Sequence, residues 1–274
     1  MKIQRRDFLK TTVAASAAAA LTSRASAASR SATAGREYYE LRAYRLKPGA
    51  AHTALDTYLE KALIPAVNGR GISSVGVFTE VDVNKNAATA TPKADTPVWV
   101  LLTHSSLQSF ADLAATLNED PSVQKAGAGY LDVPKANPAF DRIDTWLYLA
   151  FTGLPKLQVP AFSKSRARVF EMRDYESHSE LKALNKIAMF NAGEIQVMKD
   201  LGMSPVFYGQ SLAGPNLPHL RYVTCGPDLA THLGNWKKFG THPIWMKLKD
   251  DPQYKDNTSK NTSRFLTPKP YSQI

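Results

Sequence analysis

The sequence predicts an α+β protein built from two tandem ferredoxin-like repeats that together form a pseudo-twofold α+β barrel. Three landmarks that recur at one constant offset along the chain support this fold. The pentapeptide ELRAY at 40–44 returns as EMRDY at 171–175. At the same offset, Gly71-Ile72 falls on Gly202-Met203, and the Asp-Pro at 120–121 falls on the Asp-Pro at 251–252. Because internal repeats at a fixed offset indicate duplicated structural units, we divide the chain into two copies.

The two copies span residues 37–151 and 166–270. Residues 152–165 lie between them and contain Pro155 and Pro160, which is typical of a linker. Within each copy, alternating and helical hydrophobic patterns predict the order strand, helix, strand, strand, helix, strand. The expected strands are 38–45, 73–81, 98–104 and 140–151 in the first copy, and 168–175, 204–210, 220–225 and 263–267 in the second.

The segments between these strands also follow a common plan. An amphipathic helix precedes Asn68-Gly69 in the first copy and Gly202 in the second, where we expect a capping box at Ser177 and Glu180. The second and third strands are joined by polar connections, a long one at 82–96 and a shorter one at 211–218. An antiparallel sheet with helices on one face leaves its other face open, so two copies can cover each other.

The N-terminal segment 1–27 is set apart as an export signal. Arg5-Arg6 precedes Phe8-Leu9-Lys10, an alanine-rich apolar run follows, and Ala25-Ser26-Ala27 supplies small residues for cleavage. This pattern resembles the twin-arginine signal, whose machinery exports proteins already folded. It implies a periplasmic or secreted protein.

Composition excludes several functional classes. The single cysteine, Cys225, excludes an intrachain disulfide framework. The formal net charge of +10 falls to +6 without the five basic residues and one acidic residue of the signal, and the remaining basic residues are scattered. We therefore expect no nucleic-acid partner. No other segment is apolar enough to span a membrane.

The repeated pentapeptide supplies the main candidate site. Alternate residues of a strand share a face, so the polar side chains of each pentapeptide should lie together, with the apolar ones opposite. We expect the apolar set to pack under the helices and the polar set to face the barrel interior, in a cavity between the repeats. One interpretation is a closed structural network; the other is a pocket whose arginines bind an anionic group. The candidates are Glu40, Arg42, Tyr44, Glu171, Arg173 and Tyr175.

The sequence contains no motif of a known catalytic or metal site. The six histidines lack the spacing that places two ligands on one helical face, so no metal is predicted. No nucleophile elbow, P-loop or Rossmann fingerprint occurs. We expect no cofactor, although one axial histidine would suffice for haem. Trp236, His242 and Trp245 are secondary candidates, since such aromatic groups pack a core or, when exposed, mark a partner surface.

The chain resembles the NIPSNAP family. The resemblance rests on the Glu-x-Arg-x-Tyr strands, the helices that run into Gly-Ile or Gly-Met, and the aromatic stretch from Trp236 to Trp245 before an Asp-Pro. It implies the dimeric α+β barrel superfamily, and a non-catalytic module that binds a small anionic ligand or a protein. The alternative that it leaves open is a small-molecule monooxygenase or haem-handling oxidoreductase. The fused copies could stand alone as a monomer or associate as a homodimer.

Overall fold

The computed structural model describes residues 33–47 and 52–274. The chain divides into two units, residues 1–36 and 37–274, of which the second carries the repeated fold. The predicted signal at 1–27 lies outside the described residues. Within the described part of the chain, no helix combines the length and apolar character needed to cross a bilayer.

The first repeat alternates its strands with two helical segments. Its elements are β1 (Tyr38–Arg45), α2 (Thr53–Tyr58), η1 (Leu59–Leu63), α3 (Ile64–Gly69), β2 (Gly76–Asn84), β3 (Thr89–Pro92), β4 (Val98–His104), α4 (Leu107–Thr116), η2 (Leu117–Glu119), α5 (Pro121–Ala126), α6 (Ala128–Leu131) and β5 (Arg142–Ala150). α2, η1 and α3 form one continuous helical segment, in which η1 is a π-helical turn.

The second repeat has the same order without a counterpart of β3. Its elements are β6 (Val169–Glu176), α7 (Glu180–Met189), η3 (Phe190–Glu194), α8 (Ile195–Asp200), β7 (Pro205–Ala213), β8 (His219–Gly226), α9 (Leu229–Phe239), α10 (Pro243–Lys249), η4 (Pro252–Tyr254) and β9 (Lys260–Pro268). Its π-helical turn η3 follows η1 at the same offset as the two pentapeptides, so even this irregularity is repeated.

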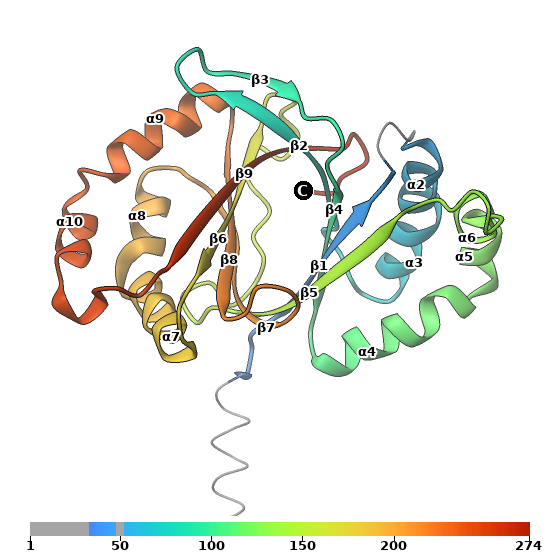
Figure 1. Ribbon diagram of the computed structural model, residues 1–274, viewed down its shortest axis with the longest axis horizontal. Helices are drawn as coiled ribbons and strands as arrows, with labels where there is room; N and C mark the ends of the chain where they lie inside the picture. The colour runs from blue at the N-terminus through green and yellow to red at the C-terminus, as the bar shows by residue number, and fades with distance from the viewer. Residues whose placement is uncertain (1–32, 48–51) are drawn as a thin grey trace, which may run out of the picture. The chain divides into compact units, whose positions relative to one another are not determined.

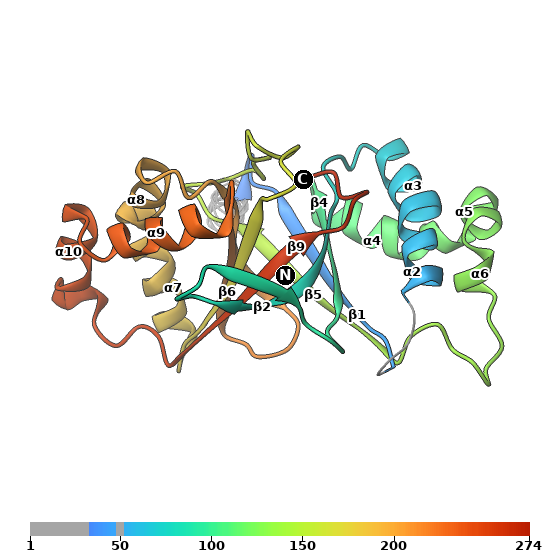
Figure 2. The same cartoon turned by 90° about the horizontal axis from the view of Figure 1, so that it is seen from above.

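The strands close into one antiparallel barrel. The strand order is β3-β2-β4-β1-β5-β7-β8-β6-β9, and β9 pairs back onto β2. The fourth strand of each repeat therefore pairs with the second strand of the other, as β5 with β7 and β9 with β2. The first repeat's helices lie on one flank of the barrel and those of the second on the opposite flank (Figures 1 and 2). This is the predicted pseudo-twofold α+β barrel of two ferredoxin-like repeats.

The prediction of which face points inward was wrong. All the barrel strands contribute to one buried cluster that contains no helical residue, and the apolar pentapeptide residues belong to it: Tyr39, Leu41, Ala43, Phe170 and Met172. The glutamate, arginine and tyrosine of each pentapeptide face the helices instead, whereas Asp174 of the second pentapeptide shares the interior face of β6 with Phe170 and Met172. The two repeats bury the apolar faces of their strands against each other inside the barrel, so each polar face is left for the helices of its own repeat. The pentapeptide arginines therefore lie on the helix-facing side of their strands, with 13% of the Arg42 side chain and 23% of the Arg173 side chain exposed.

The helices of each repeat cover a separate core. Tyr44 packs with Leu55, Leu59 and Leu63 in the first repeat, and Tyr175 packs with Phe190 and its neighbours in the second. These two cores and the barrel interior form three layers: helices, barrel and helices. The outward-facing residues of each pentapeptide therefore lie beside the helices of their own repeat. One polar cavity between the repeats was predicted, and the structure instead has two separate polar sites, one in each repeat.

A charged cluster does lie inside the barrel, but other residues form it. Arg221 donates to Asp174, and Arg264 NH1 lies 2.6 Å from the other oxygen of that carboxylate. The Arg221 guanidinium also stacks on Trp146, 4.6 Å from the ring centroid. Burial would raise the pKa of Asp174, but the charges of Arg221 and Arg264 outweigh it and lower that pKa. The cluster joins Trp146 of the first repeat to Arg221 and Asp174 of the second, which suits a structural ion-pair network.

Two local predictions also need correction. The connection at 82–96 is a β-hairpin, because β2 continues to Asn84 and pairs with β3. The side chain that caps α7 is Ser179, whose oxygen accepts from the Lys182 amide, while Ser177 instead donates to the Asn257 carbonyl. The alternating Val81–Val83 pattern could have revealed the hairpin, but its polar and small residues concealed it.

Candidate functional site

Each repeat has a pocket between the outer face of its first strand and its second helical segment. The second-repeat pocket has a volume of about 310 Å³ and is lined by Lys85, Glu171, Arg173, Leu233, Trp236, Lys237 and Phe265. The first-repeat pocket has about 300 Å³ and is lined by Glu40, Arg42, Tyr44, Phe110, Leu113, Ala114, Leu117, Asn118, Ile143 and Thr145. Of the six principal candidates, all but Tyr175 therefore line one pocket or the other.

Glu171 is the centre of the polar contacts in the second-repeat pocket. Its side chain is almost fully buried, and its Oε2 accepts from His232 Nε2 at 2.8 Å and from the indole N–H of Trp236. Its Oε1 accepts from Ser263 Oγ at 2.5 Å and from Arg173 NH1 at 3.2 Å. A carboxylate accepts only, so all four neighbours donate to it and its capacity is largely used.

These donors keep Glu171 ionised. Burial alone would raise the pKa of this carboxyl, but the hydrogen bond from His232 and the charge of Arg173 outweigh burial and lower it. The ionised Glu171 in turn helps to raise the pKa of Arg173, against the opposing effect of desolvation. The pair is therefore a fixed anion beside a fixed cation across the physiological pH range.

Arg173 presents its guanidinium to the pocket along an aromatic wall. The group lies 4.5 Å from the centroid of the Trp236 ring and 5.7 Å from that of Tyr175. Its side chain is 23% exposed, and its buried Nε has no hydrogen-bond partner. One bond to Glu171 uses only part of the five-donor guanidinium fork, so Arg173 retains donors for a ligand.

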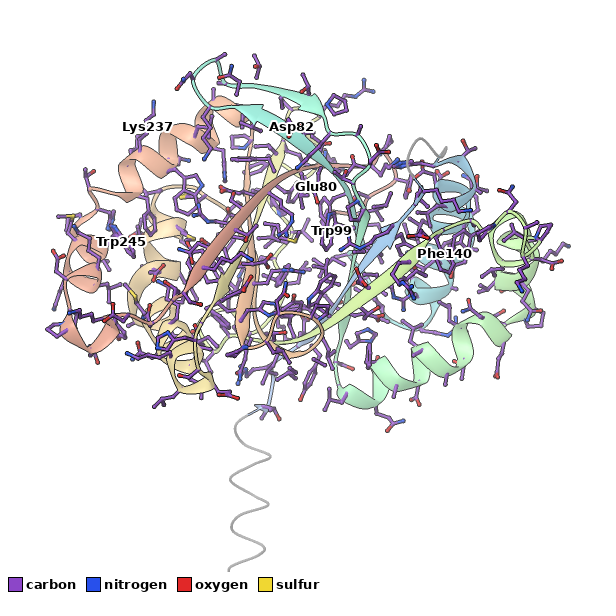
Figure 3. All side chains as sticks on the ribbon, in the orientation of Figure 1. Glu80, Asp82, Trp99, Phe140, Lys237 and Trp245 are labelled. Atoms are coloured by element: carbon purple, nitrogen blue, oxygen red, sulfur yellow. The ribbon has the colours of Figure 1, made fainter. Side chains whose placement is uncertain are left out.

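Two lysines add further positive charge to this pocket. Lys237 extends from α9, and Lys85 lies in the tip of the β2–β3 hairpin, 5.9 Å from the Phe265 ring centroid. The hairpin belongs to the first repeat but extends toward α9 of the second, the helix on which Lys237 is labelled (Figure 3). Among the described residues, neither lysine has a carboxylate within ion-pair distance. The second-repeat pocket is therefore completed by a residue of the first repeat.

The first-repeat pocket contains the equivalent Glu–Arg pair, but its other lining residues are uncharged. Glu40 Oε1 accepts from Arg42 Nε at 2.5 Å, and Oε2 accepts from His104 Nε2 at 2.9 Å. Arg42 NH1 is 3.4 Å from the Tyr44 hydroxyl. The remaining lining residues are apolar or uncharged, so one cation balances one anion. Here too burial would raise the carboxyl's pKa, while the His104 hydrogen bond and Arg42 lower it.

The other predicted residues take different positions. Tyr175 lies behind Arg173, where its hydroxyl contacts that of Tyr222 at 3.0 Å. Trp236 joins the site through Glu171, as described above. Trp245 packs against Phe239 with ring centroids 4.9 Å apart, and His242 accepts from the Ile244 amide as the N-cap of α10. Neither His242 nor Trp245 lines the pocket.

The histidines beside the two pockets are both engaged with carboxylates. The Nε2 atoms of His104 and His232 are each directed at a carboxylate, and both side chains are fully buried. In the part of the chain that the structure describes, no group of three or more His, Cys, Asp or Glu side chains could hold a metal ion.

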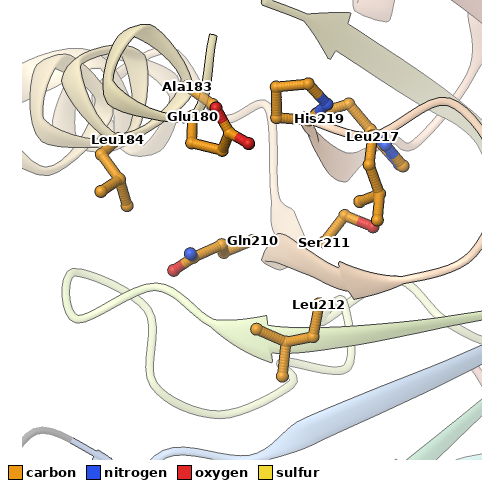
Figure 4. Close-up of a pocket in the computed structure, with 9 residues that line it drawn as sticks. Glu180, Ala183, Leu184, Gln210, Ser211, Leu212, Leu217 and His219 are labelled. Atoms are coloured by element: carbon orange, nitrogen blue, oxygen red, sulfur yellow. The ribbon is translucent and has the colours of Figure 1, made fainter.

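A third cavity, of about 370 Å³, lies between α7 and the β7–β8 connection (Figure 4). Its walls include the exposed side chains of Leu184, Leu212 and Leu217. The His219 ring at this cavity is already engaged, with Tyr148 at 3.2 Å and the Asn216 carbonyl at 3.0 Å. Burial lowers the pKa of His219, so the ring offers no positive charge.

Sequence reasoning missed most of the second-repeat pocket's lining. Lys85 and Phe265 lie far from the pentapeptide in sequence and reach it only through the hairpin and through the pairing of β6 with β9. Ser263 lies directly opposite Arg173 in that ladder, but residues 260–264 are all polar, so no alternation in the sequence marks Ser263 as a neighbour of Glu171.

The comparisons with known proteins agree with the fold and the export signal. Residues 170–273 match the NIPSNAP family model, and residues 2–22 match that of the TAT (twin-arginine translocation) pathway signal sequence. The second repeat is therefore a NIPSNAP domain, and the chain begins with a signal that directs export. No curated protein matches the chain.

Solved structures show the same architecture at low sequence identity. A candidate monooxygenase from Fusobacterium nucleatum has 7% identity and a TM-score of 0.54, with 85% of this chain and 92% of that chain covered. A candidate monooxygenase from Lactobacillus acidophilus has 6% identity and a TM-score of 0.51, with 85% and 94% covered. A NIPSNAP-like domain protein from Burkholderia xenovorans has 16% identity over 39% of this chain and 90% of that chain, with a TM-score of 0.35. At these identities the likeness to the two candidate monooxygenases shows the fold alone.

Proposed function

We propose that the protein is an exported binding module whose second-repeat pocket takes a small organic anion with an apolar body. The observation that carries this proposal is the surplus of positive charge in that pocket. Arg173, Lys85 and Lys237 line it, whereas Glu171 is the one carboxylate among the lining residues and already accepts four hydrogen bonds. An anionic group on the ligand would complete the charge balance.

The walls of the pocket indicate what the anion is attached to. Trp236, Phe265 and Leu233 give it aromatic and aliphatic surfaces, and few precisely placed polar groups among apolar walls are typical of small-molecule sites. A water molecule takes about 30 Å³ of liquid volume. If each non-hydrogen atom of a ligand takes a similar volume, the 310 Å³ pocket holds about ten of them. An aromatic or short aliphatic carboxylate fits this size and polarity.

Thermal unfolding with benzoate and with its uncharged analogue benzamide tests the proposal. Benzoate should raise the melting temperature, because a ligand at one hundred times its Kd stabilises the folded state by about 2.7 kcal/mol. Benzamide should give a much smaller shift. Arg173→Gln should abolish the benzoate effect, and Arg42→Gln, the equivalent change in the first repeat, should preserve it.

Lys237→Gln provides a second variant, since this exposed side chain has no structural partner among the described residues. It should weaken benzoate binding about twofold to fivefold, the effect of a solvent-screened charge. Equal shifts with benzoate and benzamide, or equal losses in Arg42→Gln and Arg173→Gln, would contradict the proposal.

The alternative function is that of a small-molecule oxidoreductase, and the same purified sample addresses it. Oxygen consumption with quinol-like substrates, or a Soret band after haem addition, would favour that alternative. The site geometry supports binding instead, because both buried histidines beside the pockets are committed to carboxylates. We further propose that the exported protein binds its ligand in the periplasm or outside the cell.

A further inference from the structure

A second cavity adjoins the second-repeat pocket at the seam where β2 pairs with β9. This seam pocket has a volume of about 220 Å³, and its lining includes Lys85 and Phe265, which also line the second-repeat pocket. The complete lining is Glu80, Val81, Asp82, Val83, Lys85, Lys93, Ser263, Arg264 and Phe265. Two side chains therefore form the boundary between neighbouring cavities.

Of the two boundary side chains, Lys85 is exposed and can move aside, whereas Phe265 is buried. The Lys85 ammonium lies 5.9 Å from the Phe265 ring centroid, and it is carried by the exposed tip of the β2–β3 hairpin. A lysine on a flexible four-carbon stem can change rotamer at low cost. A change of the Lys85 rotamer would therefore join the two cavities across the Phe265 ring.

The seam pocket differs from its neighbour in its charge. Apart from Lys85, its cations Lys93 and Arg264 are matched by its anions Glu80 and Asp82. Lys93 Nζ lies 3.7 Å from Glu80 and 3.9 Å from Asp82, so these contacts are looser than hydrogen bonds. The pocket therefore has donors to offer but no surplus charge, and a second anionic group would meet two carboxylates there.

We infer that the ligand is elongated, with an anionic group at Arg173, an apolar middle across Phe265, and an uncharged hydrogen-bonding group in the seam pocket. This inference rests on the proposed function, in which the second-repeat pocket binds the anionic end of the ligand. The seam pocket adds room for about seven non-hydrogen atoms beyond the roughly ten of its neighbour. An ω-hydroxy carboxylate is the simplest ligand of this class.

The test measures binding of three unbranched series to the full chain by calorimetry: carboxylates, ω-hydroxy carboxylates and α,ω-dicarboxylates of increasing length. We expect the terminal hydroxyl to improve affinity about threefold to tenfold only above a certain chain length, since a net hydrogen bond contributes that much. The dicarboxylate of that length should bind more weakly than the hydroxy acid.

Lys93→Met removes a donor from the seam pocket and should abolish the advantage of the hydroxy acid over the plain carboxylate of equal length. Lys125→Met, on an exposed face of α5, serves as the matched control and should leave that advantage unchanged. If plain carboxylates bind but the hydroxyl gives no advantage at any length, or the advantage survives in Lys93→Met, this inference fails alone. If no carboxylate binds, the proposed function fails with it.

Discussion

Each repeat carries a Glu–Arg pair on its first strand, which is β1 in the first repeat and β6 in the second. Only in the second repeat do further positively charged side chains surround the pair. Glu40 and Arg42 share a pocket with apolar and uncharged residues, whereas Glu171 and Arg173 share theirs with Lys85 and Lys237. The pair occurs in both repeats, so it belongs to the common scaffold. The residues that differ around it are those that give the second pocket its binding character.

The repeats also supply the histidine beside the glutamate from different elements. In the strand ladders, His104 lies opposite Tyr38, and Gly226 lies opposite Val169, which corresponds to Tyr38 in the second repeat. His104 and Gly226 therefore occupy equivalent positions. In the second repeat, His232 of α9 fills the space instead, and a Cβ atom on Gly226 would lie 2.6 Å from the His232 Cβ. Placing the histidine on the helix also brings Trp236, one turn later, onto Glu171.

A third difference lies in the helices below the strands. Lys186 and Glu194 form a buried ion pair in the second repeat, and the corresponding positions of the first repeat are Leu55 and Leu63, both fully buried. Desolvation raises the pKa of Glu194, partly offset by Lys186. The Lys186 ammonium also lies 5.5 Å from the Tyr175 ring centroid, next to Arg173. The first repeat forms the same helical segment with leucines at these positions.

The largest expected effect on stability comes from removing one partner of the Lys186–Glu194 ion pair. Lys186→Leu leaves Glu194 buried without its partner and should lower the free energy of unfolding by about 3–5 kcal/mol. The double variant Lys186→Leu/Glu194→Leu restores the first repeat's combination and should recover most of the loss. Urea unfolding of both variants measures this. A double variant no more stable than the single one would show that the helices of the two repeats are not interchangeable at this place.

A smaller effect is expected from Gly226→Ala. The added Cβ displaces His232 and loosens Glu171, which should cost about 1–3 kcal/mol by overpacking. Gly234→Ala, in α9, is the control, because no atom lies within 4 Å of its Cβ position and alanine favours helix over glycine by about 0.5–1 kcal/mol. Thermal unfolding should show opposite signs for the two variants. A neutral Gly226→Ala would mean that His232 has room to shift.

The smallest effect concerns acid stability. The pKa values of Glu40 and Glu171 are lower in the folded protein than the value of about 4.3 in an unfolded chain. Their stabilisation is therefore complete above that pH and is lost as the pH falls toward the folded-state values, at about 1.4 kcal/mol for each pH unit of depression. Stability measured from pH 6 to 3 should fall less steeply in Glu171→Gln and in Glu40→Gln than in the unchanged chain. An equal slope in either variant would exclude that carboxylate as a source of acid sensitivity.

Sequence periodicity predicted the elements better than their orientation. The strand expected at 98–104 is β4 itself, and the aspartates before Pro121 and Pro252 cap helical turns as their position suggests. The alternation in the pentapeptides correctly separated Arg42 from Leu41, but a period of two cannot say which of the two faces meets helices. That choice depends on how the second copy covers the first.

The amino-acid sequence by itself determined the duplication, the order of strands and helices, the export signal and the placing of each Glu–Arg pair on one strand face, because these features follow from local patterns. Only the tertiary structure decided that the arginines lie outside the barrel and that Lys85 of the first repeat completes a pocket of the second. Those features follow from barrel closure, in which β9 pairs with β2 and draws the hairpin toward α9. Contacts of this kind join residues far apart in the chain, so a local sequence pattern cannot predict them.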